Sequence, residues 1–287
     1  MIKTKGEYFI SKDGGINWLQ QSNMLLVNYY NNSGRSYNTS MVVGTDNSLP
    51  TYNQVSITNE IRSDNEKGVT NSFSVNEDEN YFTVTQSQNY YFGLGNDFEL
   101  KEVGLKSNGL FSRAVLKDLE GNPITIPITP LDDLRTRYNL EFQVTKQGLP
   151  VVFTFKDVEY QGTLKFVNPN KWESTVLGKP VSINTVGISN NMVIGLNNYV
   201  ESGMVDESIN LSDSYSAQDN RVADTYAGFA GLENLVASFT QLVFCYGSAS
   251  RNNAVAIIEF EEPLVKTADD VLSLSLSILQ EHNDGDT

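Results

Sequence analysis

Apolar and polar residues alternate along much of this chain, and the alternation predicts strands. Apolar side chains occupy every second position from Tyr138 to Val144, and again from Leu272 to Ile278 with serines between them. A period of two is typical of a strand that buries one face. Turns rich in Gly, Asn, Asp and Ser separate such segments, so the pattern predicts an all-β protein with little helix. The predicted strands are Glu7–Ser11, Met24–Tyr30, Ser40–Val43, Val69–Val75, Tyr81–Phe92, Leu110–Leu116, Ile124–Ile128, Tyr138–Val144, Val151–Phe155, Tyr160–Phe166, Gly187–Gly195, Leu242–Tyr246, Val255–Phe260 and Val271–Ile278.

The segment Lys117–Pro123 predicts a hairpin turn, because Gly121 tolerates a positive φ and the residue before a proline avoids the helical region. The strand Ile124–Ile128 that follows contains Pro127, which cannot donate to a ladder, so we expect an edge or bulged strand. Next, Thr129–Asp133 combines a capping threonine, a proline and two aspartates, which predicts a short helical turn.

Two longer helices are predicted, at Tyr52–Arg62 and Gly231–Ser238, from apolar residues at helical spacing. The polar break Lys146–Pro150 follows the best-defined strand and predicts a domain boundary. We therefore expect two packed β-sandwich halves, an N-terminal β-rich domain over residues 1–145 and a C-terminal one over residues 146–287.

The range Asn197–Asp224 is polar and weakly periodic, which predicts a long loop. In an assembly protein, such a loop would be a contact arm. We expect this range and the N-terminal Met1–Gly6 to become ordered only against neighbouring proteins.

The charge balance narrows the function classes. There are 20 basic and 35 acidic residues among 287, a net charge of −15. Nucleic acid and anionic membranes attract clustered Lys and Arg, so neither is an expected partner. No apolar run approaches the ~20 residues that span a bilayer, and no apolar h-region follows Met1. The sequence therefore predicts a soluble protein made in a cytosol.

The chain has one cysteine, Cys245, and one histidine, His282. One cysteine excludes an intramolecular disulfide, and its apolar surroundings favour a buried side chain over a reactive thiol. His282 lies in a polar tail that we expect to fray. Histidine metal sites and most triads are disfavoured, and no catalytic, cofactor-binding or metal-ligating residue is predicted.

The segment Ser11–Trp18 matches the Asp-box pattern S-x-D-x-G-x-x-W. In this motif the aspartate, here Asp13, closes a tight turn by accepting backbone amides, and glycines permit the geometry. Asp-boxes recur in sialidase-like propellers, but a propeller needs repeats and one copy is present. The favoured interpretation is a local turn, with a sialidase as the alternative.

Three other clusters have structural and functional interpretations. Glu77–Glu79 predicts a hairpin turn, with calcium binding as the alternative, although the alternate-position spacing of a calcium loop is absent. Asp132–Asp133 suits helix capping better than acid–base catalysis, although a carboxylate pair from distant strands stays open. The aromatic residues between Tyr81 and Phe98 favour a core, with a sugar platform as the alternative.

Five sequence elements follow one another in the N-terminal half. They lie at Ser22–Asn28, Val42–Asp46 with Pro50–Ile61, Asn89–Phe92 with Glu102–Leu105, Leu110–Pro123 with Ile126, and Tyr138–Phe142. The order and spacing of these elements, among them L-F-S-R-A followed by D and G-N-P, resemble a family of bacteriophage tail and neck virion proteins. The usual small-residue G-t-G element of the family is Gly44-Thr45-Asp46 here, and its glycine-rich element is Gly93-Leu94-Gly95-Asn96.

The resemblance implies a structural virion component made in the bacterial host cytoplasm. Its expected partners are copies of itself and other tail or neck proteins, in a ring or fibre-attachment complex at the tail, neck or baseplate. Neither nucleic acid nor membrane is an expected partner. Two alternatives stay open: a receptor- or glycan-binding module at the tail tip that contacts host-surface glycans, and a carbohydrate-degrading virion enzyme.

Overall fold

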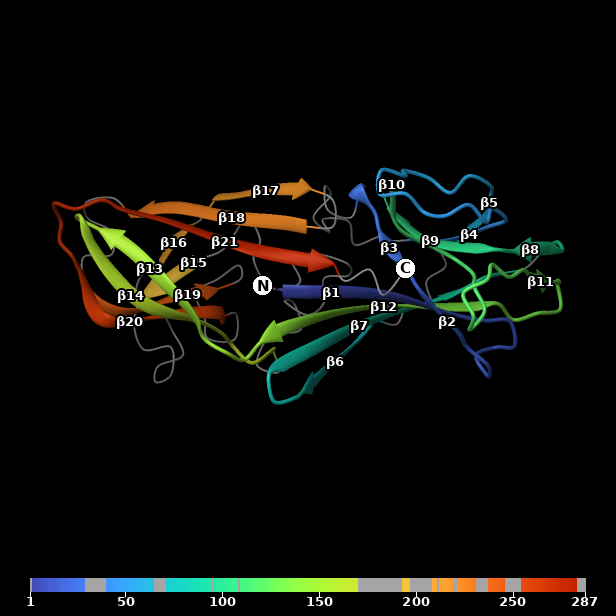
Figure 1. The fold of residues 1–287 in the computed structure, drawn as a ribbon, viewed down its shortest axis with the longest axis horizontal. Helices are drawn as coiled ribbons and strands as arrows, with labels where there is room; N and C mark the ends of the chain where they lie inside the picture. Colours follow the sequence, from blue (N-terminus) through green and yellow to red (C-terminus); the bar gives the residue numbers. More distant parts are fainter. Residues whose placement is uncertain are drawn as a thin grey trace.

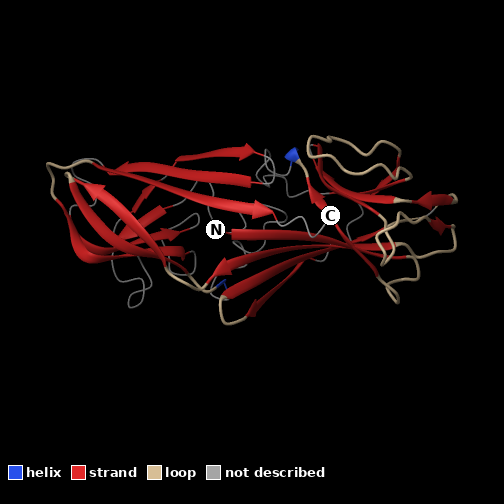
Figure 2. Ribbon diagram, in the orientation of Figure 1, coloured by secondary structure: helices blue, strands red, loops and turns tan. Residues whose placement is uncertain are grey.

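The computed structural model confirms an all-β protein, and Figure 2 shows strands over most of the described chain. It describes residues 2–28, 40–64, 71–93, 95–107, 109–169, 193–196, 208–210, 212–218, 221–230, 237–245 and 254–282. The first strands are β1 Ile2–Ser11, β2 Leu19–Ser22, β3 Met24–Leu25, β4 Ser40–Gly44, β5 Glu60–Asp64, β6 Asn71–Glu77, β7 Tyr81–Tyr91, β8 Phe98–Leu100, β9 Glu102–Ser107, β10 Gly109–Val115 and β11 Ile126–Ile128. They are followed by β12 Arg135–Thr145, β13 Leu149–Phe155, β14 Val158–Phe166, β15 Val193–Leu196, β16 Ser208–Asn210, β17 Ser212–Gln218, β18 Arg221–Ala230, β19 Ala237–Cys245, β20 Ala254–Lys266 and β21 Leu272–His282.

An eight-stranded sheet runs through the middle of the molecule in the order β17-β18-β21-β1-β12-β7-β6, with β2 paired to β1 (Figure 1). Its longest pairing joins β7 and β12 without a register shift, from Arg135 opposite Tyr91 to Thr145 opposite Tyr81. In both strands buried and half-buried residues alternate strictly. The period of two in the sequence therefore marks the face that the core covers.

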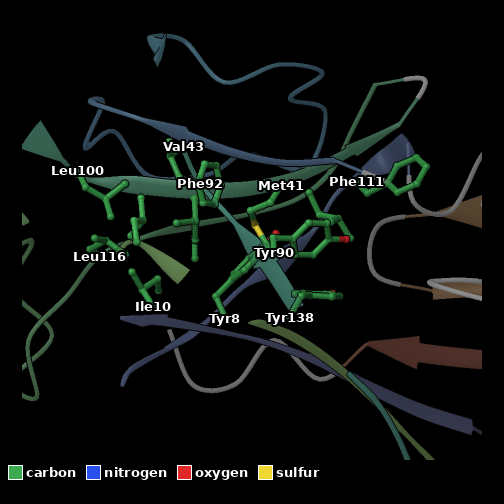
Figure 3. Close-up of a cluster of buried hydrophobic side chains, with 14 of the residues drawn as sticks. Tyr8, Ile10, Met41, Val43, Tyr90, Phe92, Leu100, Phe111, Leu116 and Tyr138 are labelled. Carbon is green, nitrogen blue, oxygen red and sulfur yellow. The ribbon is translucent and has the colours of Figure 1, made fainter. Parts of the chain in front are cut away.

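A five-stranded sheet in the order β3-β10-β9-β4-β5 packs on the N-terminal part of the large sheet. The core between these two layers includes Tyr8, Tyr138 and Leu140 from the large sheet, and Met41 and Phe111 from the smaller one (Figure 3). A two-stranded sheet of β8 and β11 adds Leu100 and Ile128 to the same core. This arrangement is a β-sandwich.

Two pairs of polar side chains are hydrogen-bonded inside this sandwich. The rings of Tyr8 and Tyr138 lie 4.9 Å apart, and the Tyr8 hydroxyl bonds Ser112 on β10. The Tyr138 hydroxyl accepts a 3.3 Å bond from Asn23. Burial raises the pKa of Tyr138 to about 12, so its hydroxyl stays protonated. Buried hydroxyls without partners would cost stability, so these pairs also fix how the two sheets align.

The C-terminal part contains a six-stranded sheet in the order β13-β14-β20-β19-β15-β16. Phe260 on β20 is the centre of its aromatic packing. The rings of Phe153, Tyr160 and Phe239 lie 6.1, 6.4 and 6.5 Å from the ring of Phe260. These three residues come from β13, β14 and β19, so the ring of Phe260 on β20 packs against side chains from three other strands of this sheet.

The large sheet contains strands from both predicted domains. β1 pairs on one side with β12 and on the other, in parallel, with β21, where Ile2 lies opposite Gln280 and Thr4 opposite His282. Figure 1 accordingly shows β21 and β18 running beside β1. The division into residues 1–145 and 146–287 stays a prediction. The shared sheet joins the two predicted domains through the pairing of β1 with β21.

The hairpin and edge-strand predictions are confirmed. The Asp118 amide donates to the Asn122 carbonyl, and Gly121 has a φ of +86°. Ile128 is buried whereas Pro127 is exposed, as the alternation predicts. Among the described strands β11 pairs with β8 alone, so Pro127 lies in a two-stranded sheet, where a missing donor is tolerated.

Three local predictions are wrong. Tyr52–Arg62 is not a helix, since it contains turns and the beginning of β5. The strand predicted at Met24–Tyr30 ends at Leu25, and Val27–Asn28 is helical. Thr129–Asp132 forms a single turn in which the Asp132 carboxylate accepts the Thr129 amide at 2.7 Å, without continuing as a helix.

The two predicted arms are also wrong in the described part of the chain. Met1–Gly6 is predicted to be ordered only against neighbouring proteins, but its residues from Ile2 onward lie in β1, where Lys3 and Thr4 pair with β12 on one side and β21 on the other. Asn197–Asp224 was expected to be a loop, but it contains β16, β17 and the beginning of β18. Likewise, His282 lies opposite Thr4 instead of in a frayed tail. The predicted helix Gly231–Ser238 lies outside the described residues except for its last two, which belong to β19.

Substituting Gly44 by alanine should lower the free energy of unfolding by about 1–3 kcal/mol, the usual cost of overpacking a core. A Cβ at this position would meet Glu102 Oε1 at 2.4 Å, Ile57 Cγ2 at 2.7 Å and the Asn59 carbonyl oxygen at 2.9 Å. Gly93→Ala is the matched control, because nothing lies within 4 Å of a Cβ there. Urea unfolding of both variants measures the difference; equal stabilities would contradict the close packing around Gly44.

Candidate functional site

The Asp-box segment forms the turn that its sequence predicts. Asp13 Oδ1 accepts the amides of Ile16 and Asn17 at 3.1 and 3.0 Å, and the hydroxyl of Ser11 at 2.6 Å. These bonds, that from the Asn17 amide above all, hold the pKa of Asp13 well below its usual range. Gly14 and Gly15 have φ of +73° and +90°, backbone angles that residues with a Cβ rarely adopt. The segment is therefore a rigid turn between β1 and β2.

Two further turns are closed in the same way. Asp118 accepts the amides of Glu120 and Asn122 at 3.0 and 2.8 Å, in the turn after β10. Asp132 accepts the amide and hydroxyl of Thr129 at 2.7 and 2.9 Å, in the turn after β11. The pKa values of Asp118 and Asp132 are lowered, mainly by the amides that each carboxylate accepts. We call these three segments, around Asp13, Asp118 and Asp132, the capped turns.

Backbone hydrogen bonds connect the turns around Asp13 and Asp132. The Gly14 amide donates to the Asp133 carbonyl at 3.0 Å, and the Asp133 amide donates to the Lys12 carbonyl at 3.0 Å. The turn around Asp118 is joined to β2, because Gln21 and Lys117 exchange two hydrogen bonds of 2.9 Å. In Figure 1, β2, β8 and β11 lie at the end of the molecule remote from β13 and β20. The capped turns therefore belong to one end of the sandwich.

Each capped turn presents one large aliphatic side chain to solvent. Ile16 is 80% exposed, Leu131 is 97% exposed and Leu119 is fully exposed. Single exposed aliphatic residues are common on protein surfaces, but three at the tips of linked, rigid turns form a set. Because the turns are already ordered, a partner that buries these side chains pays little additional conformational entropy. These residues are the candidate contact site.

A second cluster is electrostatic and lies on the face of the five-stranded sheet that is turned away from the large sheet. Arg113 on β10 donates to Glu102 Oε2 on β9 at 2.6 Å, and both side chains are completely buried. The guanidinium also bonds Gln54 at 3.1 Å and Asp46 at 3.3 Å. Glu102 Oε1 accepts the Asp46 amide at 3.0 Å, so both of its oxygens are used. We call Arg113, Glu102, Asp46 and Gln54 the buried network.

Residues of the buried network come from three of the sequence segments quoted above for the phage-family resemblance. Arg113 lies in the L-F-S-R-A element, Glu102 in the E-V-G element and Asp46 in the G-t-G element. Gly44 and Gly104 provide the space, since a Cβ on Gly104 would meet Leu110 and Ile57 at 2.8 and 3.0 Å. Distant elements of the resemblance therefore converge on one structural unit in the five-stranded sheet.

This geometry supports a structural role for the buried network. Burial raises the pKa of Glu102, against the opposing effect of the Arg113 guanidinium. Both groups are fully covered, so neither can transfer a proton to a bound substrate unless the groups that cover them move. Sequence reasoning missed this pair. The signal that could have found it is a charged residue, Arg113, inside the apolar strand from Leu110 to Leu116.

The other sequence clusters also have structural positions. Asp78 accepts the amides of Asn80 and Tyr81 at 2.7 Å each, and Glu77 pairs with Lys146 at 2.6 Å, which confirms the hairpin turn. In the aromatic stretch, Tyr90 and Phe92 are buried in the core, as expected. Within the described ranges, no group of three or more His, Cys, Asp and Glu residues is arranged to hold a metal ion.

Comparisons with protein-family models, curated proteins and solved structures found no match. Among the described residues, none of the helical segments has the length and apolar character needed to cross a membrane.

Replacing Arg113 by methionine should lower the free energy of unfolding by about 3–5 kcal/mol, because it leaves Glu102 as a buried charge without its partner. Lys165→Met provides the control. Lys165 forms an ion pair with Glu259 in which both side chains remain substantially exposed, and losing such a pair costs about 0–1 kcal/mol. Urea denaturation at neutral pH compares the two. If both substitutions lower the free energy of unfolding by similar amounts, the pair of Arg113 and Glu102 is not shielded from solvent as the structure shows.

Proposed function

We propose that this chain is a non-enzymatic structural protein of a bacteriophage virion. It would occupy the tail, neck or baseplate in repeated copies, as part of a ring or fibre-attachment complex. The resemblance of the N-terminal half supports this class. The observation that carries the proposal is the set of capped turns, which hold Ile16, Leu119 and Leu131 exposed on rigid supports at one end of a sandwich.

The capped turns suit a contact between different proteins. Leu119 and Leu131 would each enter an apolar pocket of a neighbouring virion protein, where burying one such side chain contributes about 1.5–3 kcal/mol. Aspartates that close the turns stay ionised near neutral pH, since their pKa values are lowered. A basic rim around the pockets would complement them and orient the two proteins during assembly.

The two alternative functions have less support. A sugar platform needs open aromatic faces, but Tyr90 and Phe92 are buried in the core, and the guanidinium of Arg135 lies 5.2 Å from the ring centre of Tyr91. A glycosidase needs a carboxyl group that stays protonated to donate to the leaving group. Asp13, Asp118 and Asp132 are instead held ionised by the amides of their own turns.

The double substitution Leu119→Ser and Leu131→Ser should reduce incorporation into particles at least about tenfold, because two buried anchors are lost. The experiment supplies the variant from a plasmid to a phage that lacks the gene, and measures the chain in purified particles by immunoblot. Both positions are exposed, so thermal unfolding of the purified variant should change little.

Val271→Ser is the matched control, since Val271 is an exposed aliphatic residue immediately before β21, away from the capped turns. It should enter particles at the wild-type level. Two outcomes would contradict the proposal. The wild-type chain would be missing from particles, or the double variant would be incorporated as well as the control.

A further inference from the structure

The strand β13 differs from every other outer strand of the three large sheets. Among the described strands, β3, β16 and β2 are two, three and four residues long, whereas β5, β6 and β17 each contain at least one charged residue. Short length and charge are the usual features that keep an open sheet edge from pairing with another chain. β13, with the sequence LPVVFTF, has seven residues and no charge.

One face of β13 is also exposed to solvent. Pro150, Val152 and Thr154 point to the exposed face, with Val152 59% exposed. Leu149, Val151 and Phe153 on the opposite face are only half-buried, although Phe153 contacts Phe260. On its inner side β13 pairs along its full length with β14, so its backbone is already extended. Pro150 removes one donor near the beginning of the strand, which leaves Val151–Phe155 for pairing.

We propose that β13 is a self-association seam, at which β13 of one copy pairs antiparallel with β13 of a second copy. The six-stranded sheets of the two copies would then form one continuous sheet, with the two Val152 side chains close together across a two-fold axis. This seam deepens the function proposed above and rests on its claim that the chain works in repeated copies.

The charge distribution favours a second copy as the occupant. Every copy carries a net charge of −15, so two copies repel unless the contact avoids opposed carboxylates. The strand β13 has no charged residue and satisfies that condition. A basic partner would instead be expected to bind an acidic surface. The hairpin turn at Lys156 and Asp157, with φ of +52° and +59°, joins β13 to β14, which is its one partner among the described strands.

A two-fold pairing also limits the size of the assembly. When β13 pairs with its own copy, both edges are used and the contact closes as a dimer. In Figure 1, β13 and β14 lie at the end of the molecule remote from β8 and β11, so the capped turns stay accessible in such a dimer. One end would thus bind a copy and the other end a different protein.

Sedimentation analysis of the purified full chain tests the seam, at concentrations from about 1 to about 500 µM and at low and high salt. We expect a reversible dimer that tightens as salt screens the net charge. Val152→Lys should weaken it at least about tenfold, because the seam would bring two ammonium groups together at the two-fold axis.

Gln161→Lys is the matched control, because Gln161 lies directly opposite Val152 on β14 and is exposed, one strand inside the edge. It adds the same charge to the same face, so dimerisation should be unchanged. Hydrogen exchange gives a second readout: amides within Val151–Phe155 should exchange more slowly as the protein concentration rises, in the wild type but not in Val152→Lys.

The outcomes separate the seam from the proposed function. Dimers that persist in Val152→Lys, or that form without slower exchange in β13, would refute the seam and leave assembly in repeated copies standing. A chain that stays monomeric at every concentration and salt refutes the seam, and the particle experiment with the capped turns then decides the function independently. Growth beyond a dimer at the β13 edge would contradict the two-fold pairing.

Discussion

The ion pair between Arg113 and Glu102 is the constraint around which the N-terminal sandwich is organised. Two opposite charges with no solvent contact are tolerated only when every polar atom has a partner, and here Asp46 and Gln54 complete the set. Removing water from these groups requires close packing around them. The glycines at 44 and 104, and Ile57 against both, are consequences of that requirement.

The pair also explains why segments far apart in the chain must fold together. Asp46 and Arg113 are 67 positions apart, yet they are linked through β4, β9 and β10 in a single sheet. The buried polar contacts of Tyr8, Tyr138 and Ser112 then connect this sheet to the larger one. The hydrogen bonds of Tyr8 with Ser112 and of Tyr138 with Asn23 favour one alignment of the two sheets. The result is a rigid body whose outer turns keep fixed positions.

Local chemistry could be predicted from the sequence, whereas long-range pairing could not. The Asp13 turn and the hairpin at Asp118 were predictable because donors and acceptors lie within four positions of each other. The spacing of Ile57 and Ile61 favoured a helix, but Ile57 is buried in the core while Ile61 lies in β5, so tertiary contacts decided the backbone. β17 was missed because its serine-rich sequence has little apolar alternation, and its pairing with β18 comes from the backbone. The buried network needed partners from three distant segments, which spacing in one sequence does not reveal.

The proposed subunit has distinct surfaces at its two ends: rigid turns with exposed aliphatic side chains, and an uncharged strand edge. A cryo-electron microscopy map of the virion that encodes this chain tests the structural role most directly. We expect repeated copies of the sandwich in the tail, neck or baseplate, with the capped turns in contact with a different virion protein. A virion map that accounts for the tail, neck and baseplate without this chain would contradict the account.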